Sequence, residues 1–251
     1  MLKLSNISKS FTDDAGQVNA LIQHLDVEFN TGEFTIIIGA NGSGKTTLLN
    51  LIAGLILPDA GSIVIAQKEV QQLKSFERSA YIARIFQNPF QGTVAELTVM
   101  ENMRLAFLRN RGKGLHLGID KDFKEKVKSA IAKLNPGLEN KTEQKMGTLS
   151  GGQRQSLTLV MATLCDAKIV LMDEPTAALD PKSANRLMEN AAQLIHEQKL
   201  TTIMVTHNMR EAANYGNRLI MMKEGKILRD LNAKDKSALD STTLSNWLYY
   251  D

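Results

Sequence analysis

The stretch that decides the fold is Gly39-Ala40-Asn41-Gly42-Ser43-Gly44-Lys45-Thr46, which fits the pattern G-x-x-x-x-G-K-[ST]. The apolar run Thr35 to Ile38 precedes it, and Thr47-Leu-Leu-Asn-Leu-Ile-Ala53 follows it with a helical pattern. Glycines let backbone N–H groups turn inward around a phosphate chain, and the helix N-terminus adds a favourable dipole. The sequence therefore predicts a phosphate-binding loop between a strand and a helix. Lys45 should reach the β- and γ-phosphates, and the Thr46 hydroxyl should bind Mg²⁺.

The hydrophobic pattern on either side of this loop predicts the fold class. Continuous apolar runs at Phe34 to Ile38, Ile169 to Met172 and Thr202 to Val205 are typical of parallel strands that helices cover on both faces. Before residue 31 the pattern alternates instead, with Leu21, Leu25, Val27 and Phe29 separated by polar residues. Such alternation indicates an antiparallel layer with one wet face. We predict an α/β fold with an N-terminal antiparallel β layer.

Residues 88–165 contain few strand signals. Within them, Phe123, Val127, Ile131 and Leu134 recur at helical spacing between lysines and acids. We therefore expect a helical subdomain inserted into the α/β core. The predicted organisation is one domain over 1–251, with a core at about 1–87 and 166–230, a helical subdomain at about 88–165 and a short C-terminal helix at about 231–251.

Composition excludes several classes of protein. The 251 residues are 43% hydrophobic and 23% charged, a soluble globular mixture, so the chain is not a collagen, a disordered tail or a coiled coil. No stretch reaches about 18 uninterrupted apolar residues, and the N-terminus lacks the apolar region of a signal peptide, so we expect neither a membrane span nor export. A net charge of +3 is too weak to indicate nucleic acid. The single cysteine, Cys165, suits a reducing cytoplasm and is expected to be a small buried hydrophobe.

Two carboxylates follow the apolar run that ends at Met172. Asp173 and Glu174 would lie at the C-terminal end of a buried strand, where open α/β sheets bind ligands. Asp173 is then a candidate Mg²⁺ partner, and Glu174 could polarise the water that attacks the γ-phosphate. Alone, such a pair is more often part of a solvated loop. Together with the phosphate-binding loop, it indicates a nucleotide-hydrolysing site.

A second stretch, Leu149-Ser-Gly-Gly-Gln-Arg-Gln155, leads into an apolar helix. Ser150 and Gln153 fit a capping box, so one interpretation is simply a well-capped helix. That interpretation does not explain why Gly151 and Gly152 stand in the first turn, since each glycine in a helix costs about 1 kcal/mol of stability relative to alanine. Their missing side chains would let an anion approach the N–H groups of the first turn. We infer a second phosphate-binding helix terminus, at a site shared between two chains.

Taken in order, these motifs resemble those of an ATP-binding-cassette (ABC) ATPase, a family of P-loop NTPases, over nearly the whole chain. The loop at 39–46 matches the Walker A motif, 149–155 the signature motif and 169–174 the Walker B motif. The remaining matches are Gln87 for the Q-loop, Ala178-Leu-Asp180 for the D-loop and His207 for the switch histidine. The resemblance implies a head-to-tail dimer with two ATP molecules between a Walker A loop and the signature of the other chain.

The resemblance also implies roles for single residues. Phe11 would stack on adenine, although core packing is an alternative, and Asp180 would communicate across the dimer or cap a helix before Pro181. Glu174, His207, Lys45 and Gln87 are the expected catalytic residues, and Thr46, Gln87 and Asp173 the expected Mg²⁺ ligands. The expected nucleotide contacts are Phe11, Gly39, Ala40, Asn41, Gly42, Ser43, Gly44, Lys45, Thr46, Thr47, Gln87, Ser150, Gly151, Gly152, Gln153, Asp173, Asp180 and His207. Ala40 stands where many members of the family have proline, and we expect little consequence.

For transport, a member of this family without a membrane span needs a separate permease, which would dock near Gln87–Met103. The signature and the region from Leu200 to Arg218 look like those of importer ATPases that work with lipoprotein solute receptors, some linked to amino acids. The resemblance thus implies an ATPase at the cytoplasmic face of the membrane that drives import of a small organic solute and has no nucleic-acid partner. The alternatives are an exporter or lipid-transport ATPase, and a soluble cassette such as an iron–sulfur assembly factor.

Overall fold

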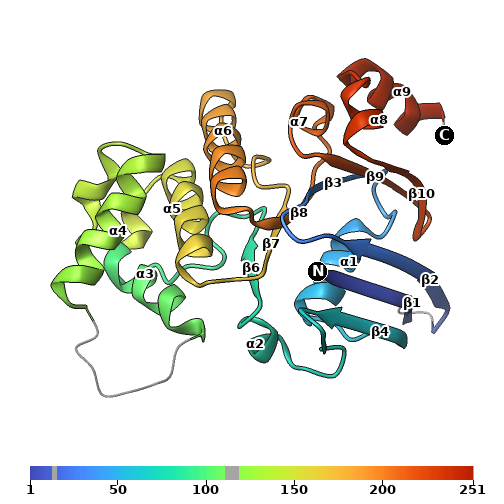
Figure 1. The fold of residues 1–251 in the computed structure, drawn as a ribbon, viewed down its shortest axis with the longest axis horizontal. Coiled ribbons are helices and arrows are strands. Elements are labelled where there is room, and N and C mark those ends of the chain that lie inside the picture. The colour runs from blue at the N-terminus through green and yellow to red at the C-terminus, as the bar shows by residue number, and fades with distance from the viewer. Residues whose placement is uncertain (13–15, 111–118, 251) are drawn as a thin grey trace.

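The computed structural model describes residues 1–12, 16–110 and 119–250. The N-terminal strands form an antiparallel sheet in the order β2-β1-β4-β5 (Figure 1). Its strands are β1 (Leu2–Thr12), β2 (Val18–Phe29), β4 (Ala60–Ile65) and β5 (Lys68–Glu69). The predicted antiparallel layer is confirmed.

A second sheet has the order β10-β9-β3-β8-β7-β6. Its strands are β3 (Phe34–Ile38), β6 (Ile82–Ile85), β7 (Ile169–Asp173), β8 (Thr201–Val205), β9 (Arg218–Lys223) and β10 (Lys226–Leu231). All pairs are parallel except the β9–β10 hairpin. Every residue of β3, β7 and β8 is buried, which explains their continuous apolar runs. Helix α1 (Lys45–Ala53) packs in one apolar cluster with strands of both sheets.

The described residues between β6 and β7 form helices and short 3₁₀ turns, and none belongs to either sheet. Helices α3 (Val99–Phe107), α4 (Lys121–Leu134) and α5 (Gly151–Leu164) lie together at one end of the molecule (Figure 1). Helix α4 buries the four apolar residues whose spacing predicted it. The other helices are α2 (Ser75–Arg78), α6 (Pro181–Gln198), α7 (Met209–Asn214), α8 (Ala233–Ser237) and α9 (Ser241–Tyr250), and the 3₁₀ turns are η1 (Leu108–Asn110), η2 (Leu138–Lys141) and η3 (Met146–Thr148).

Two details of the sequence prediction were wrong. Strand β2 buries Ile22 and not Leu21, because a β-bulge shifts the pairing: Ile7 pairs with Leu25 but Lys9 pairs with Ile22. The positive φ of 48° at His24 marks the extra residue. The C-terminal segment, predicted as one short helix at about 231–251, forms two short helices, α8 and α9, after β10 ends at residue 231.

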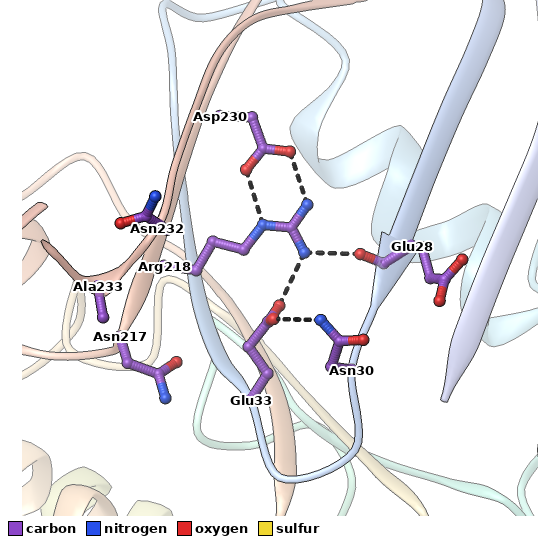
Figure 2. Close-up of a pocket in the computed structure, with 8 residues that line it drawn as sticks. All are labelled: Glu28, Asn30, Glu33, Asn217, Arg218, Asp230, Asn232 and Ala233. Carbon is purple, nitrogen blue, oxygen red and sulfur yellow. Dashed lines mark hydrogen bonds and ion pairs between the residues drawn. The ribbon is translucent and has the colours of Figure 1, made fainter. Parts of the chain in front are cut away.

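An ion-pair network joins the two sheets at the N-terminal ends of β3 and β9 (Figure 2). The Arg218 guanidinium donates to both carboxylate oxygens of Asp230, at 2.7 and 2.6 Å, to Glu33 Oε1 at 2.8 Å and to the Glu28 carbonyl at 2.6 Å. Its hydrogen bonds to Asp230 are the main reason that the pKa of Arg218 is raised. The pocket around Arg218 lies at the opposite end of β3 from Gly39, so it is separate from the phosphate-binding loop.

Candidate active site

The loop between β3 and α1 leaves the N-terminus of the helix open. Gly44 is the N-cap residue, with φ of 97°, and it supplies no side-chain cap. Residues 40–42 and Thr46 are exposed, whereas Lys45 is buried. The Lys45 Nζ donates to the carbonyls of Gly39 at 2.7 Å and Ala40 at 2.8 Å. The predicted strand, loop and helix are therefore present, with the N–H groups of the first helical turn available to an anion.

Close backbone approach explains why this loop needs glycine. A Cβ on Gly39 would lie 2.2 Å from the Met222 carbonyl oxygen, which no small shift relieves. The turn between β9 and β10 is hydrogen-bonded to the loop, since the Gly225 N–H donates to the Ser43 carbonyl at 3.1 Å. A Cβ on Gly42 would meet nothing within 4 Å, so only its φ of 79° favours glycine there.

The first carboxylate at the end of β7 faces the loop. Asp173 Oδ1 lies 3.5 Å from the Thr46 hydroxyl, while Oδ2 accepts from Arg84 at 3.0 Å. A hydroxyl and a carboxylate oxygen suit Mg²⁺, which takes few protein ligands and completes its shell with phosphates and water. The donor set of Thr46 and Asp173 therefore fits this ion. Burial lowers the pKa of Lys45, and the charges of Glu174 and Asp173 act in the opposite direction.

The second carboxylate brings three of the predicted catalytic residues together. Glu174 Oε2 accepts from Gln87 Nε2 at 3.1 Å and lies 3.0 Å from His207 Nδ1. The Glu174 side chain is 20% exposed, so one part of this carboxylate is held and another part faces solvent. Its backbone has a φ of 44°, a left-handed conformation that non-glycine residues adopt mostly at turns and functional sites. This arrangement can hold and activate a water molecule.

Glu211 was not indicated by the sequence. Its buried carboxylate accepts from the Thr176 hydroxyl at 2.6 Å and from the Thr206 hydroxyl at 2.7 Å. Thr176 follows Glu174 by two residues and Thr206 precedes His207, so Glu211 links, through two side-chain hydroxyls, the segments that carry Glu174 and His207. The only signal in the sequence is an acid placed in the first turn of α7, where acids are also common for their effect on the helix dipole.

The N-terminus of α5 is closed by its own side chains. Ser150 Oγ accepts from the Gln153 N–H at 3.3 Å, and Gln153 Oε1 accepts from the Ser150 N–H at 3.2 Å, which confirms the capping box. The two glycines also have a packing role: a Cβ on Gly151 would lie 3.3 Å from Pro89, and one on Gly152 would lie 3.2 Å from Ser183. Contacts within the chain therefore account for part of the requirement that we assigned to an anion.

A second unpredicted residue joins α5 to the catalytic strands. The Gln155 side-chain amide donates to the carbonyl of Phe86 at 2.8 Å and to that of Pro175 at 3.1 Å. These carbonyls belong to the residues next to Gln87 and Glu174. The helix that carries the signature motif is thus hydrogen-bonded to the segments that carry the catalytic side chains.

The last two predicted residues lie outside these networks. Asp180 caps α6, since its Oδ1 accepts from the N–H groups of Lys182 and Ser183, both at 3.1 Å. The side chain of Ser183, followed by its N–H group, is the main cause that lowers the pKa of Asp180. The helix-cap alternative is confirmed, and the role across a dimer stays a prediction. Phe11 is 42% exposed near the end of β1, with Lys9 Nζ 5.6 Å from its ring, so it is not part of the buried core.

Comparison with known proteins agrees with this geometry. The family model described as ABC transporter matches residues 22–177. The chain is 40% identical to a tyrosine transport ATP-binding protein of Clostridioides difficile (strain R20291) over 95% of both chains. It is also 32% identical to a macrolide export ATP-binding/permease protein, MacB, of Vibrio parahaemolyticus, over 93% of this chain and 35% of that protein. The dimeric post-hydrolysis structure of the ATP-binding cassette MJ0796, bound to ADP and Pi, superposes with a TM-score of 0.78 and 29% identity, over 93% of this chain and 99% of that one. The chain therefore belongs to the ABC transporter family, as one of its ATPases.

Proposed function

We propose that this chain is the ATP-hydrolysing subunit of an importer for a small organic solute such as an amino acid, and that it drives a separate membrane permease. The observation that carries the catalytic part is the Glu174 carboxylate, which Gln87 and His207 hold and whose charge acts on the pKa of Lys45 in the phosphate-binding loop. The importing part and the class of solute are supported by the relative named for tyrosine transport.

In the proposed reaction, the loop N–H groups and Lys45 bind the β- and γ-phosphates, and Glu174 accepts a proton from the water that attacks the γ-phosphorus. His207 holds Glu174 and stabilises charge on the transferring group. Thr46 and Asp173, with Gln87, would hold Mg²⁺, which supplies charge neutralisation at the β- and γ-oxygens when bound. Phe11 would stack on the adenine.

The signature motif acts in this proposal on the ATP of a second copy. Two chains close head to tail, so that the Gly151 and Gly152 N–H groups approach the γ-phosphate on the other chain and Asp180 faces the dimer interface. The related MJ0796 cassette is described as dimeric with ADP and Pi, which supports this arrangement. Hydrolysis then removes charge that bridges the two chains, and the dimer reopens.

The permease would dock near Gln87–Met103. Phe90 is 59% exposed and Val94 is 45% exposed, so this segment offers apolar contacts at the surface. A solute-binding lipoprotein would complete the complex, and this subunit would act at the cytoplasmic face. In the described part of the chain, no helix is both long and apolar enough for a membrane span.

Glu174→Gln tests the catalytic part, because the amide keeps the size of the side chain but cannot accept the proton. We expect ATP turnover to fall by about 10²–10⁴-fold while ATP binding and ATP-dependent dimerisation persist. Turnover is measured by phosphate release and dimerisation by sedimentation. Glu143→Gln, at an exposed carboxylate of the helical region, is the matched control and should hydrolyse at the wild-type rate. Wild-type turnover in Glu174→Gln would refute the assignment.

Export is the second candidate function, because a macrolide export protein aligns with 93% of this chain. Affinity purification of the tagged chain from detergent-solubilised membranes, followed by mass spectrometry, separates the candidates. Recovery of a permease together with a solute receptor supports import. Recovery of a permease without a receptor favours export, and recovery of soluble assembly factors alone contradicts both.

A further inference from the structure

We propose that Arg84 is a positioning residue that holds the Asp173 carboxylate so that only one oxygen faces the cation, and that it thereby favours Mg²⁺ over Ca²⁺. This inference rests on the proposed function, since it concerns the ion that Thr46 and Asp173 would hold. Arg84 lies on β6, where it is the register partner of Leu171 on β7. Asp173 is two residues further along β7, so both side chains project from the same face of the sheet.

The Arg84 guanidinium is fixed from three directions. Nη2 donates to Asp173 Oδ2 at 3.0 Å, and Nη1 donates to Asn50 Oδ1 on α1 at 2.7 Å. The ring of Phe86 lies 4.8 Å from its Cζ atom. The Arg84 and Asp173 side chains are only 11% and 12% exposed, in contrast to the mobile ion pairs of a protein surface. A planar guanidinium can satisfy Asn50 and Asp173 together, whereas a lysine ammonium on a flexible stem offers no such fork.

The two oxygens of Asp173 consequently have different environments. Oδ2 is engaged by Arg84, while Oδ1 faces the Thr46 hydroxyl at 3.5 Å. A cation beside Thr46 therefore meets one carboxylate oxygen. Mg²⁺ accepts this, because it is octahedral, takes one or two carboxylates singly and keeps its waters. Ca²⁺ takes 6–8 oxygens and often binds both oxygens of a carboxylate, so the held carboxylate is a poorer ligand for it.

A ratio of affinities separates this geometric role from simple charge. Removal of a positive charge should strengthen the binding of both divalent cations, because both carry the same charge. Release of Oδ2 should benefit Ca²⁺ more. The ratio of the Ca²⁺ and Mg²⁺ dissociation constants therefore reports whether the carboxylate is held, and an ion pair with a purely structural role would leave it unchanged.

The experiment titrates a non-hydrolysable ATP analogue into the full chain at a series of Mg²⁺ or Ca²⁺ concentrations and follows nucleotide binding by calorimetry. The dependence of nucleotide affinity on each cation gives that cation's dissociation constant. We expect Arg84→Gln to lower the Ca²⁺-to-Mg²⁺ ratio of dissociation constants about tenfold. Arg84→Lys and Asn50→Ala, which keep the positive charge but lose one half of the clamp, should lower it by a smaller factor. Lys168→Gln removes an exposed charge at the opposite end of β7 and should leave the ratio unchanged.

An unchanged ratio in Arg84→Gln, with both affinities shifted together, would overturn the proposal. Arg84 would then act only through its positive charge and would not orient the Asp173 carboxylate. If Arg84→Gln does not fold, as judged by circular dichroism, the Lys and Asn50 variants decide, and a wild-type ratio in both refutes the clamp. If nucleotide binding to the wild-type chain does not depend on either cation, the cation site of the proposed function fails instead.

Discussion

The two helix N-termini assigned to phosphate differ in how they are capped. Helix α1 begins after Gly44, which supplies no side-chain cap, whereas α5 begins after Ser150, which forms a complete capping box with Gln153. The α1 terminus therefore leaves its N–H groups for a ligand, and the α5 terminus satisfies part of its own. The α1 terminus can therefore receive an anion without help from another chain. The α5 terminus is capped by its own side chains, and only the N–H groups that the capping box does not satisfy remain for an anion.

The largest expected effect concerns the loop before the open N-terminus of α1. Gly39→Ala places a Cβ 2.2 Å from the backbone oxygen of Met222, so it should lower the free energy of unfolding by about 3 kcal/mol and abolish ATP binding. Gly42→Ala is the matched control, because its Cβ has open space and only the left-handed backbone resists, at about 1 kcal/mol. Urea unfolding measures both. Equal losses would mean that the close approach to Met222 does not determine the residue.

Lys45→Ala tests the same terminus without disturbing its backbone. We expect ATP affinity to fall by about 10–100-fold, since the variant loses a charge-assisted hydrogen bond of about 1.5–3 kcal/mol to phosphate. The effect should appear in the monomer, at protein concentrations below dimerisation, and a fluorescent ATP analogue can follow it. Ser150→Ala should keep the monomer's ATP affinity, because its helix would act on the nucleotide of another chain. If the Ser150→Ala monomer instead loses ATP affinity, the N-termini of α1 and α5 act on the same nucleotide.

The same contrast explains what the sequence could predict. The α1 loop and the capping box are local patterns, in which a few neighbouring residues determine the backbone and its hydrogen bonds. The capping box was therefore predicted to the residue, and the helix after the loop was predicted to within two residues, since α1 begins at Lys45 and not at Thr47. The parallel strands followed in the same way from continuous apolar runs, because a strand buried on both faces tolerates few polar residues.

The unpredicted contacts join residues that are far apart in the chain. Arg84 meets Asp173 and Gln155 meets Phe86 only because β6, β7 and α5 are neighbours in the fold, and no spacing in the sequence encodes these pairs. The bulge at His24 was missed for a related reason. The predicted alternation of β2 is correct from Leu25 to Phe29, but the extra residue changes which face the earlier part presents, so Ile22 is buried in place of Leu21.

A smaller loss of stability is expected when the cap of α5 is removed. Ser150→Ala removes the side-chain acceptor for the Gln153 N–H and should lower the free energy of unfolding by about 1 kcal/mol, while Ser150→Gly should cost only a few tenths. Asp180→Ala, which removes the cap of α6, is the comparable variant and should cost a similar amount. Urea unfolding measures all three. If Ser150→Ala unfolds like the wild-type protein, the capping box does not stabilise the ligand-free helix.

The smallest expected change in stability is also the one that separates the two explanations for Gly152. Alanine favours a helix by up to about 1 kcal/mol over glycine, but its Cβ would lie 3.2 Å from Ser183, so we expect Gly152→Ala to change the free energy of unfolding by less than about 0.5 kcal/mol. ATP-dependent dimerisation of the Glu174→Gln chain, followed by sedimentation, should nevertheless be lost if the glycine lets an anion approach. Adding Ser183→Gly removes the contact within the chain and leaves the new Cβ in front of the N–H groups. If dimerisation stays absent in the double variant, Gly152 is needed for the ligand. If dimerisation returns, packing against α6 is the whole reason for the glycine, and the second phosphate site must be placed elsewhere.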